Sequence, residues 1–130
     1  MSFTILRTGD QAWEERPPVG EGAARYSLDV TSATGITESR ARVWRLLPGS
    51  RGRRHAEQAQ EEVFYVVSGT LTMLVGDPPE RLEVQAGEIV AVKPGTGIQM
   101  HNTGDADAVV FAYGAPPVTG QVDYLDDIAL

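Results

Sequence analysis

The chain has 130 residues, 42% of them hydrophobic, and carries a formal net charge of −7 with no cysteine. This length suits a single domain with its own core. The acidic balance argues against nucleic acid as a partner, because nucleic acids bind to basic surfaces. Without cysteine there are no disulfides or thiolate sites, and no apolar run approaches the ~20 residues that span a bilayer. With no signal-peptide pattern at its start, we expect a cytoplasmic protein without a membrane partner.

Short apolar segments separated by glycine- and proline-rich turns predict an all-β fold. Residues 24–30 alternate apolar and polar side chains as a half-buried strand does, and residues 40–47 alternate arginine with Ala41 and Val43. Further strands are predicted, in chain order, at 62–67, 70–75, 81–84, 89–92, 98–102 and 108–113. Strands of this length and spacing indicate an antiparallel sandwich or barrel.

The same pattern predicts one domain over residues 1–130. We expect an N-terminal arm at 1–23, a barrel core at about 24–114 and a C-terminal tail at 115–130, because no linker or repeat divides the chain. Gly69 and Gly87 stand between predicted strands, at turns where a positive φ is expected and a Cβ would cost energy.

Two spaced motifs lie within the predicted core. The first runs through Gly49, His55, Glu57, Glu62 and Gly69. The second runs through Gly87, Pro94, Gly95, Ile98 and Asn102. His55 and Glu57 are two residues apart, so a strand carries both on one face.

These motifs resemble those of the cupin family, in particular single-domain cupins of type 2, whose fold is a jelly-roll β-barrel. In that family a second histidine stands at the position of Glu57 and a third at the position of Ile98. The resemblance therefore implies a degenerate metal-binding motif, with Glu62 pointing inward from the neighbouring strand and Met100 beside Ile98. The two replacements remove nitrogen donors that favour Fe, Ni, Cu and Zn.

The first functional hypothesis is a binding module that holds a small polar or anionic molecule in the barrel without a tightly bound metal. The predicted ligand pocket consists of Arg45, Arg53, His55, Glu57, Glu62, Ile98 and Met100. Gln99 and Tyr65 are additional candidates for contacts with the ligand. In this reading the histidine and the carboxylates survive as a hydrogen-bonded, charge-paired cluster.

The alternative hypothesis is a metal-dependent enzyme of the kinds that the cupin family includes: a dioxygenase, an isomerase or epimerase, or a lyase. His55, Glu57 and Glu62 would then hold a divalent Mn, Fe, Zn or Ni ion, since three protein ligands suffice for a catalytic metal. Metal-free acid–base catalysis by His55 and Glu62 is a third reading. The sequence leaves open whether the protein is an enzyme.

Six arginines gather between residues 40 and 54, where they form either ordinary strand-surface charge or a rim that steers anions toward a pocket. His101 has strand parity opposite to Ile98, so we expect it to face outward, at a surface or an interface. A homodimer is expected, because isologous pairing is the commonest assembly. Trp13 and Trp44 are candidates for its interface.

Overall fold

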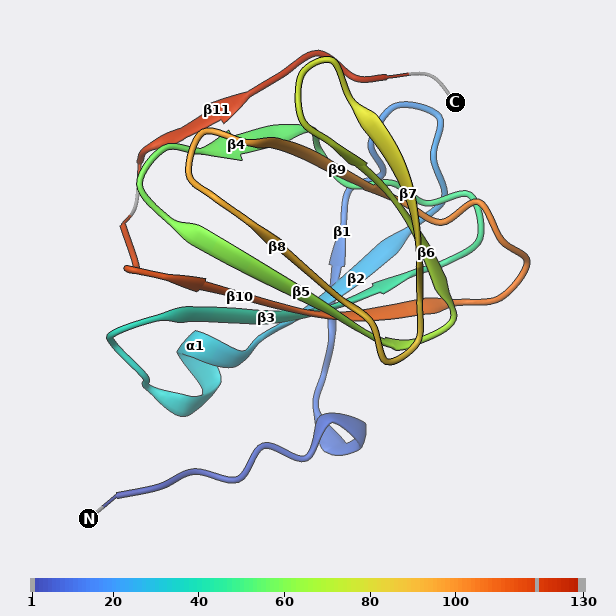
Figure 1. Ribbon diagram of the computed structural model, residues 1–130. Coiled ribbons are helices and arrows are strands. Elements are labelled where there is room, and N and C mark those ends of the chain that lie inside the picture. The colour runs from blue at the N-terminus through green and yellow to red at the C-terminus, as the bar shows by residue number, and fades with distance from the viewer. Residues whose placement is uncertain (1, 119, 129–130) are drawn as a thin grey trace.

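The computed structural model describes residues 2–118 and 120–128. Within them, two antiparallel sheets face each other and form an open-ended barrel (Figure 1). The six-stranded sheet has the order β1 (Glu14–Arg16), β2 (Arg25–Asp29), β3 (Arg40–Leu46), β10 (Ala108–Ala115), β5 (Glu61–Ser68) and β8 (Ile89–Val92). The five-stranded sheet has the order β11 (Val122–Tyr124), β4 (His55–Glu57), β9 (Gly97–His101), β6 (Thr70–Val75) and β7 (Glu80–Gln85).

The predicted all-β jelly-roll fold is confirmed, and each predicted strand has a counterpart within two residues of its expected bounds. The predicted arm and tail each contribute a short strand that the pattern did not reveal. β1 pairs with β2, and β11 pairs with β4. Three-residue strands are too short to show an alternation of their own, and they form because a partner strand supplies the hydrogen bonds.

Two short helices complete the described chain: η1 (Thr8–Asp10) in the N-terminal arm and α1 (Val30–Thr34) after β2. Asp29 caps α1, because its carboxylate accepts a hydrogen bond from the Ser32 amide at 3.1 Å. The helix lies against β3, where the Thr31 hydroxyl bonds to the backbone of Ala41. No helix among the described residues is long and apolar enough to cross a membrane.

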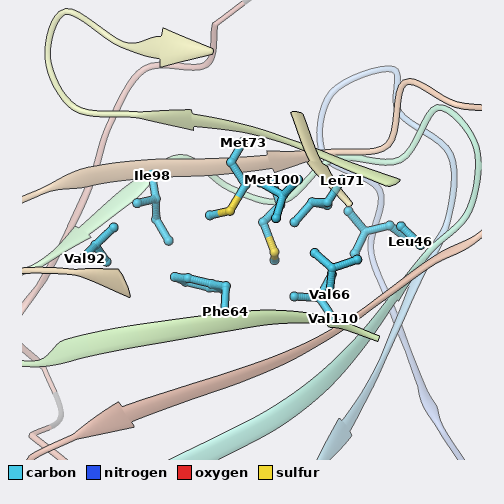
Figure 2. Close-up of a cluster of buried hydrophobic side chains, with 11 residues drawn as sticks. Leu46, Phe64, Val66, Leu71, Met73, Val92, Ile98, Met100 and Val110 are labelled. Atoms are coloured by element: carbon cyan, nitrogen blue, oxygen red, sulfur yellow. The ribbon is translucent and has the colours of Figure 1, made fainter. Parts of the chain in front are cut away.

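The hydrophobic core fills one end of the barrel interior. Side chains from both sheets point toward one another there, with Ile98 and Met100 on β9 opposite Phe64 and Val66 on β5 (Figure 2). Leu46 on β3 and Val110 on β10 extend this cluster further along the barrel interior (Figure 2). Apolar burial of this kind supplies most of the free energy that holds the two sheets together.

The two turn glycines adopt the predicted conformation. Gly69 has φ +75° and Gly87 has φ +90°, which are values that residues with a Cβ adopt at a cost. They differ in their surroundings: a Cβ on Gly69 would lie 2.3 Å from the carbonyl oxygen of Asp107, whereas one on Gly87 would have no neighbour within 4 Å. Gly69 is therefore required by both conformation and space.

Candidate functional site

A cavity of about 520 Å³ occupies the barrel end away from the hydrophobic core. Its walls come from the first halves of β3 and β5, from the second half of β10, and from β2 and β4. The side chains that line it are mostly charged or aromatic, and Phe64, Ile98 and Met100 form its apolar floor. A cavity of this volume accommodates a small molecule.

One wall carries a histidine and two carboxylates. β4 presents His55 and Glu57 on the same face, as their spacing predicts, and Glu62 approaches from β5 of the other sheet. One ligand atom from each of the three residues lies within 4.8 Å of the others. Nε2 of His55 is 3.9 Å from Oε1 of Glu62. The structure thus brings together residues from two different strands of the first motif.

A backbone contact orients the His55 ring. Its Nδ1 donates to the carbonyl oxygen of Arg53 at 3.1 Å, because a carbonyl can only accept. Nε2 is therefore the nitrogen that faces Glu62 and the cavity. Fixing one imidazole nitrogen in this way determines which nitrogen is available to a ligand or an ion.

Burial, followed by the negative charge of Glu57, raises the pKa of Glu62 to about 7 against the smaller opposing effect of the positive charge of Arg40. The Glu62 carboxyl therefore exchanges its proton near neutral pH. It can donate a hydrogen bond when it is protonated and accept one when it is ionised.

Arginines form the opposite wall of the cavity. The inward positions of β3 are Arg40, Arg42 and Trp44, and Arg25 lines the cavity from β2. The guanidinium carbons of Arg25 and Arg42 lie 5.0 and 5.7 Å from the centroid of the Trp44 ring. This packing holds both cations against a rigid aromatic surface.

Among the predicted pocket residues, Arg53 does line the cavity, with its guanidinium carbon 3.6 Å from the centroid of the Tyr124 ring. Arg45 does not. It is on the opposite face of β3, where its guanidinium lies over the ring of Trp13 at 4.8 Å. The side chains at the even-numbered positions of β3 face inward, whereas Arg45 is at an odd-numbered position. Arg40 and Arg42 therefore line the cavity, where Arg45 was expected.

The two faces of β3 differ in chemistry. Ala41 and Val43 are buried at the positions that alternate with Arg40, Arg42 and Trp44. These three side chains line the cavity, and of the two apolar residues only Ala41 also borders it. Trp44 is accordingly a wall of the cavity and not a surface residue. The alternation along residues 40–47 does not by itself say which face points inward, and here the barrel interior is itself polar.

Three further candidates have different surroundings. Gln99 is buried on β9 and is among the residues that line the cavity, and its side-chain amide donates to the Gly52 carbonyl at 3.0 Å and contacts Asp127. Tyr65 is on the outer face of β5 and is exposed. His101 lies on the opposite face of β9 from Ile98, as its parity predicts, but it is only 6% exposed. It is not a surface residue, because neighbouring groups that include Arg51 and Asp127 enclose it.

The C-terminal segment contributes to the cavity in a way that the sequence did not indicate. β11 pairs with β4 so that Tyr124 is opposite His55, and Val122 and Tyr124 both line the cavity. The Leu125 amide also donates to the Arg54 carbonyl at 2.9 Å. This segment therefore covers the edge of β4, the strand that carries His55 and Glu57.

The family assignment follows from comparison with known proteins. Residues 42–113 match the family described as the cupin domain. The chain belongs to the cupin family. No curated protein matches its sequence.

Several solved structures share this cupin fold. A sugar phosphate isomerase of the cupin superfamily from Silicibacter pomeroyi has a TM-score of 0.80 and 24% identity, over 95% of this chain and 83% of that one. A predicted oxalate decarboxylase from Thermotoga maritima has a TM-score of 0.77 and 18% identity, over 87% and 99%. KdgF from a Halomonas species has a TM-score of 0.72 and 16% identity, over 89% and 96%. At these identities the likeness establishes the fold alone.

The cupin barrel of this chain offers a metal ion only part of a coordination shell. His55, Glu57 and Glu62 are close enough to converge on one ion after small side-chain movements, and they are ligands of suitable type. The neighbouring inward position on β9, directly opposite His55, is Ile98, which is 1% exposed and has no donor atom. The residues therefore fit an ion held by three protein ligands, with an aliphatic side chain beside it.

Proposed function

We propose that this cupin binds a small polar or anionic molecule in its cavity without a tightly bound metal. The observation that carries the proposal is the cavity itself, because it is large enough for a small molecule and combines an arginine wall with a carboxylate and histidine cluster. Two of the similar structures are a predicted oxalate decarboxylase and a sugar phosphate isomerase, and oxalate and sugar phosphates are small anions. These two likenesses support an anionic ligand for this cavity.

Two features of the cluster support a metal-free site. Ile98 places apolar surface at the edge of the cluster, where a divalent ion would need a ligand or water. The pKa of Glu62 at about 7 also allows this carboxyl to keep a proton beside Glu57. A shared proton and His55 can then stabilise the cluster without an ion.

The alternative function is a metal-dependent enzyme: a dioxygenase, an isomerase or epimerase, or a lyase. The convergence of the three ligand atoms within 4.8 Å is the observation that favours it. His55, Glu57 and Glu62 would hold Mn, Fe, Zn or Ni, and the ion would supply a Lewis acid at its open positions. A metal-free enzyme that uses Glu62 as an acid or base is also consistent with a pKa near neutrality.

Elemental analysis of protein purified without a nickel column tests the choice between these functions. We expect well below one equivalent of Mn, Fe, Zn or Ni per chain. A thermal-shift screen of small carboxylates, phosphates and sugars should then give at least one compound that raises the melting temperature through linkage. One tightly held metal ion per chain would contradict the metal-free proposal, and a screen without any stabilising compound would contradict ligand binding.

We further propose that the protein is a cytoplasmic homodimer. The outer face of the six-stranded sheet supports a second copy as partner, because Tyr65, Ile89 and Tyr113 are exposed there on three adjacent strands. Phe3 and Ile5 are also exposed on an N-terminal arm that extends away from the barrel (Figure 1). Apolar side chains on both a flat face and a projecting arm are typical of self-association.

Sedimentation velocity at micromolar concentration tests the dimer. We expect a dimeric species for the natural chain and a shift toward monomer for Ile89→Glu, with Glu80→Gln on the exposed start of β7 as a control. A monomeric natural chain would contradict this proposal. It would leave the proposed ligand site unaffected, because Tyr65 and Ile89 do not line the cavity.

A further inference from the structure

Arg25 is a buried cation without a carboxylate partner. It is only 7% exposed, and no ion pair among the described residues includes it. Its Nε donates to the Pro17 carbonyl oxygen at 3.4 Å, and its guanidinium lies over Trp44. Burial of an uncompensated charge is costly unless a counter-charge is supplied. The cavity that Arg25 lines is the place from which such a charge can come.

Two further arginines add positive charge at the same place. Arg16 and Arg53 line the same cavity, and both lie near enough to Arg25 to lower its pKa, after the larger effect of burial. Nε of Arg16 is buried without a hydrogen-bond partner, while its Nη1 contacts Glu14 at 3.3 Å. Three guanidinium groups thus share a single neighbouring carboxylate among the ion pairs of the described chain.

Arg42, in contrast to Arg25, has a carboxylate partner for its charge. Its guanidinium pairs with Asp29 at 3.5 Å and donates to the Ser27 hydroxyl at 2.9 Å, and it packs on the same Trp44 ring. Arg25 has the aromatic contact but lacks the carboxylate. The positive charge around Arg25, Arg16 and Arg53 is therefore less balanced by carboxylates than the charge of Arg42 is.

We propose that Arg16, Arg25 and Arg53 form a subsite that binds an oxyanion group, either a carboxylate or a phosphate, at one end of the cavity ligand. Planar guanidinium groups bind both kinds of oxyanion through paired hydrogen bonds. This inference rests on the proposed ligand-binding function and adds the chemistry of one end of the ligand.

The histidine and carboxylate cluster bears on the rest of the ligand. His55, Glu57 and Glu62 are hydrogen-bonding groups that would repel a second anion and that match hydroxyl groups. Between the two ends, Trp44 and Phe64 offer apolar surface. The ligand class is therefore a small polyhydroxylated molecule with one terminal carboxylate or phosphate.

Three probes with the same six-carbon chain test this inference. Calorimetric titrations of the full chain use gluconate, glucitol 1-phosphate and neutral glucitol, which share one carbon chain and configuration and differ in the group at C1. We expect one of the two acids to bind at least tenfold more tightly than glucitol. Comparing gluconate with the phosphate then identifies which oxyanion the subsite prefers.

Arg25→Gln should reduce this preference at least tenfold, and Arg53→Gln provides a second, more exposed position if the first variant does not fold. Arg45→Gln is the matched control, because Arg45 also stacks on a tryptophan but lies outside the cavity. Circular dichroism verifies that each variant is folded.

The inference is overturned if glucitol binds as tightly as both acids, if neither acid binds, or if a folded Arg25→Gln or Arg53→Gln keeps the full preference. These results leave the proposed function in place as long as the broader thermal-shift screen finds a ligand. Failure of that screen, in contrast, would remove the function on which the inference rests.

Discussion

The two ends of the barrel interior are built by the same strands and have opposite chemistry. Along β3 the inward side chains run from Arg40 and Arg42 through Trp44 to Leu46, and along β5 they run from Glu62 to Val66. One end is a packed apolar core, and the other is a charged cavity.

This difference shows how a small domain can hold uncompensated charge. The apolar end supplies the favourable burial, so that the charged end can tolerate groups such as Arg25 and Glu62 whose desolvation is unfavourable. Stability and ligand recognition are therefore separated along the strands. Substitutions at the two ends should differ in both the sign and the size of their effects.

The largest effect is expected at the apolar end. Leu71 is 0% exposed within the core, so Leu71→Ala should lower the free energy of unfolding by about 2–5 kcal/mol through lost burial and a residual cavity. Thr70→Ala, at the exposed neighbouring position on β6, is the control and should cost much less. Urea denaturation measures both, and equal losses would contradict the assignment of the core.

The charged end should make the stability of the protein depend on pH. The folded-state pKa of Glu62 is raised from 4.5 to about 7, so the folded protein binds this proton more tightly than the unfolded chain does. The free energy of unfolding should therefore fall as pH rises through this range, by an upper limit on the order of 3 kcal/mol. Glu62→Gln should remove this fall.

Urea denaturation of chelator-treated wild type and Glu62→Gln at pH 4 and pH 8 provides the measurement. The variant should be the more stable protein at pH 8, and the two should be similar at pH 4. A stability difference that does not change with pH would mean that the carboxyl of Glu62 is not desolvated in the folded protein.

The turns at Gly69 and Gly87 should give an intermediate effect. Gly87→Ala should cost about 1–3 kcal/mol, because alanine must adopt a positive φ there. Gly69→Ala should cost more, since its Cβ would also collide with the Asp107 carbonyl. Thermal or urea denaturation compares the two variants. Unchanged stability in both would show that the turn conformations are wrong.

The smallest expected effect is a change in metal affinity at the boundary between the two ends, where Ile98 pairs with His55. Glu57→His combined with Ile98→His adds two imidazole donors beside His55 and Glu62. After chelator treatment, the double variant should bind Ni²⁺ or Zn²⁺ at least tenfold more tightly than wild type, which is about 1.4 kcal/mol.

Calorimetric titration measures this affinity, and the single variant Glu57→His should give an intermediate value. Equally tight binding by wild type would favour the metal-dependent alternative. A folded double variant that binds no metal would show that the side chain at position 98 does not reach the cluster.

Much of the fold could be predicted from local pattern. Turn residues such as Gly69 and Gly87 delimit the strands, and period-two alternation defines the strand segments between them. The pairing of His55 with Glu57 on one face follows from the same alternation. These features depend only on residues close in sequence, which is why the sequence reveals them.

Which face of a strand looks inward, and what it meets there, could not be predicted in the same way. Alternation separates Arg42 from Val43 but does not say which one faces the cavity. Only the barrel brings Arg25 and Arg53 close enough for their charges to interact, and only the pairing of β11 with β4 places Tyr124 opposite His55. Local pattern encodes the strands and their turns, whereas contacts between strands distant in sequence depend on how the sheets pair and close, and these contacts decided the composition of the site.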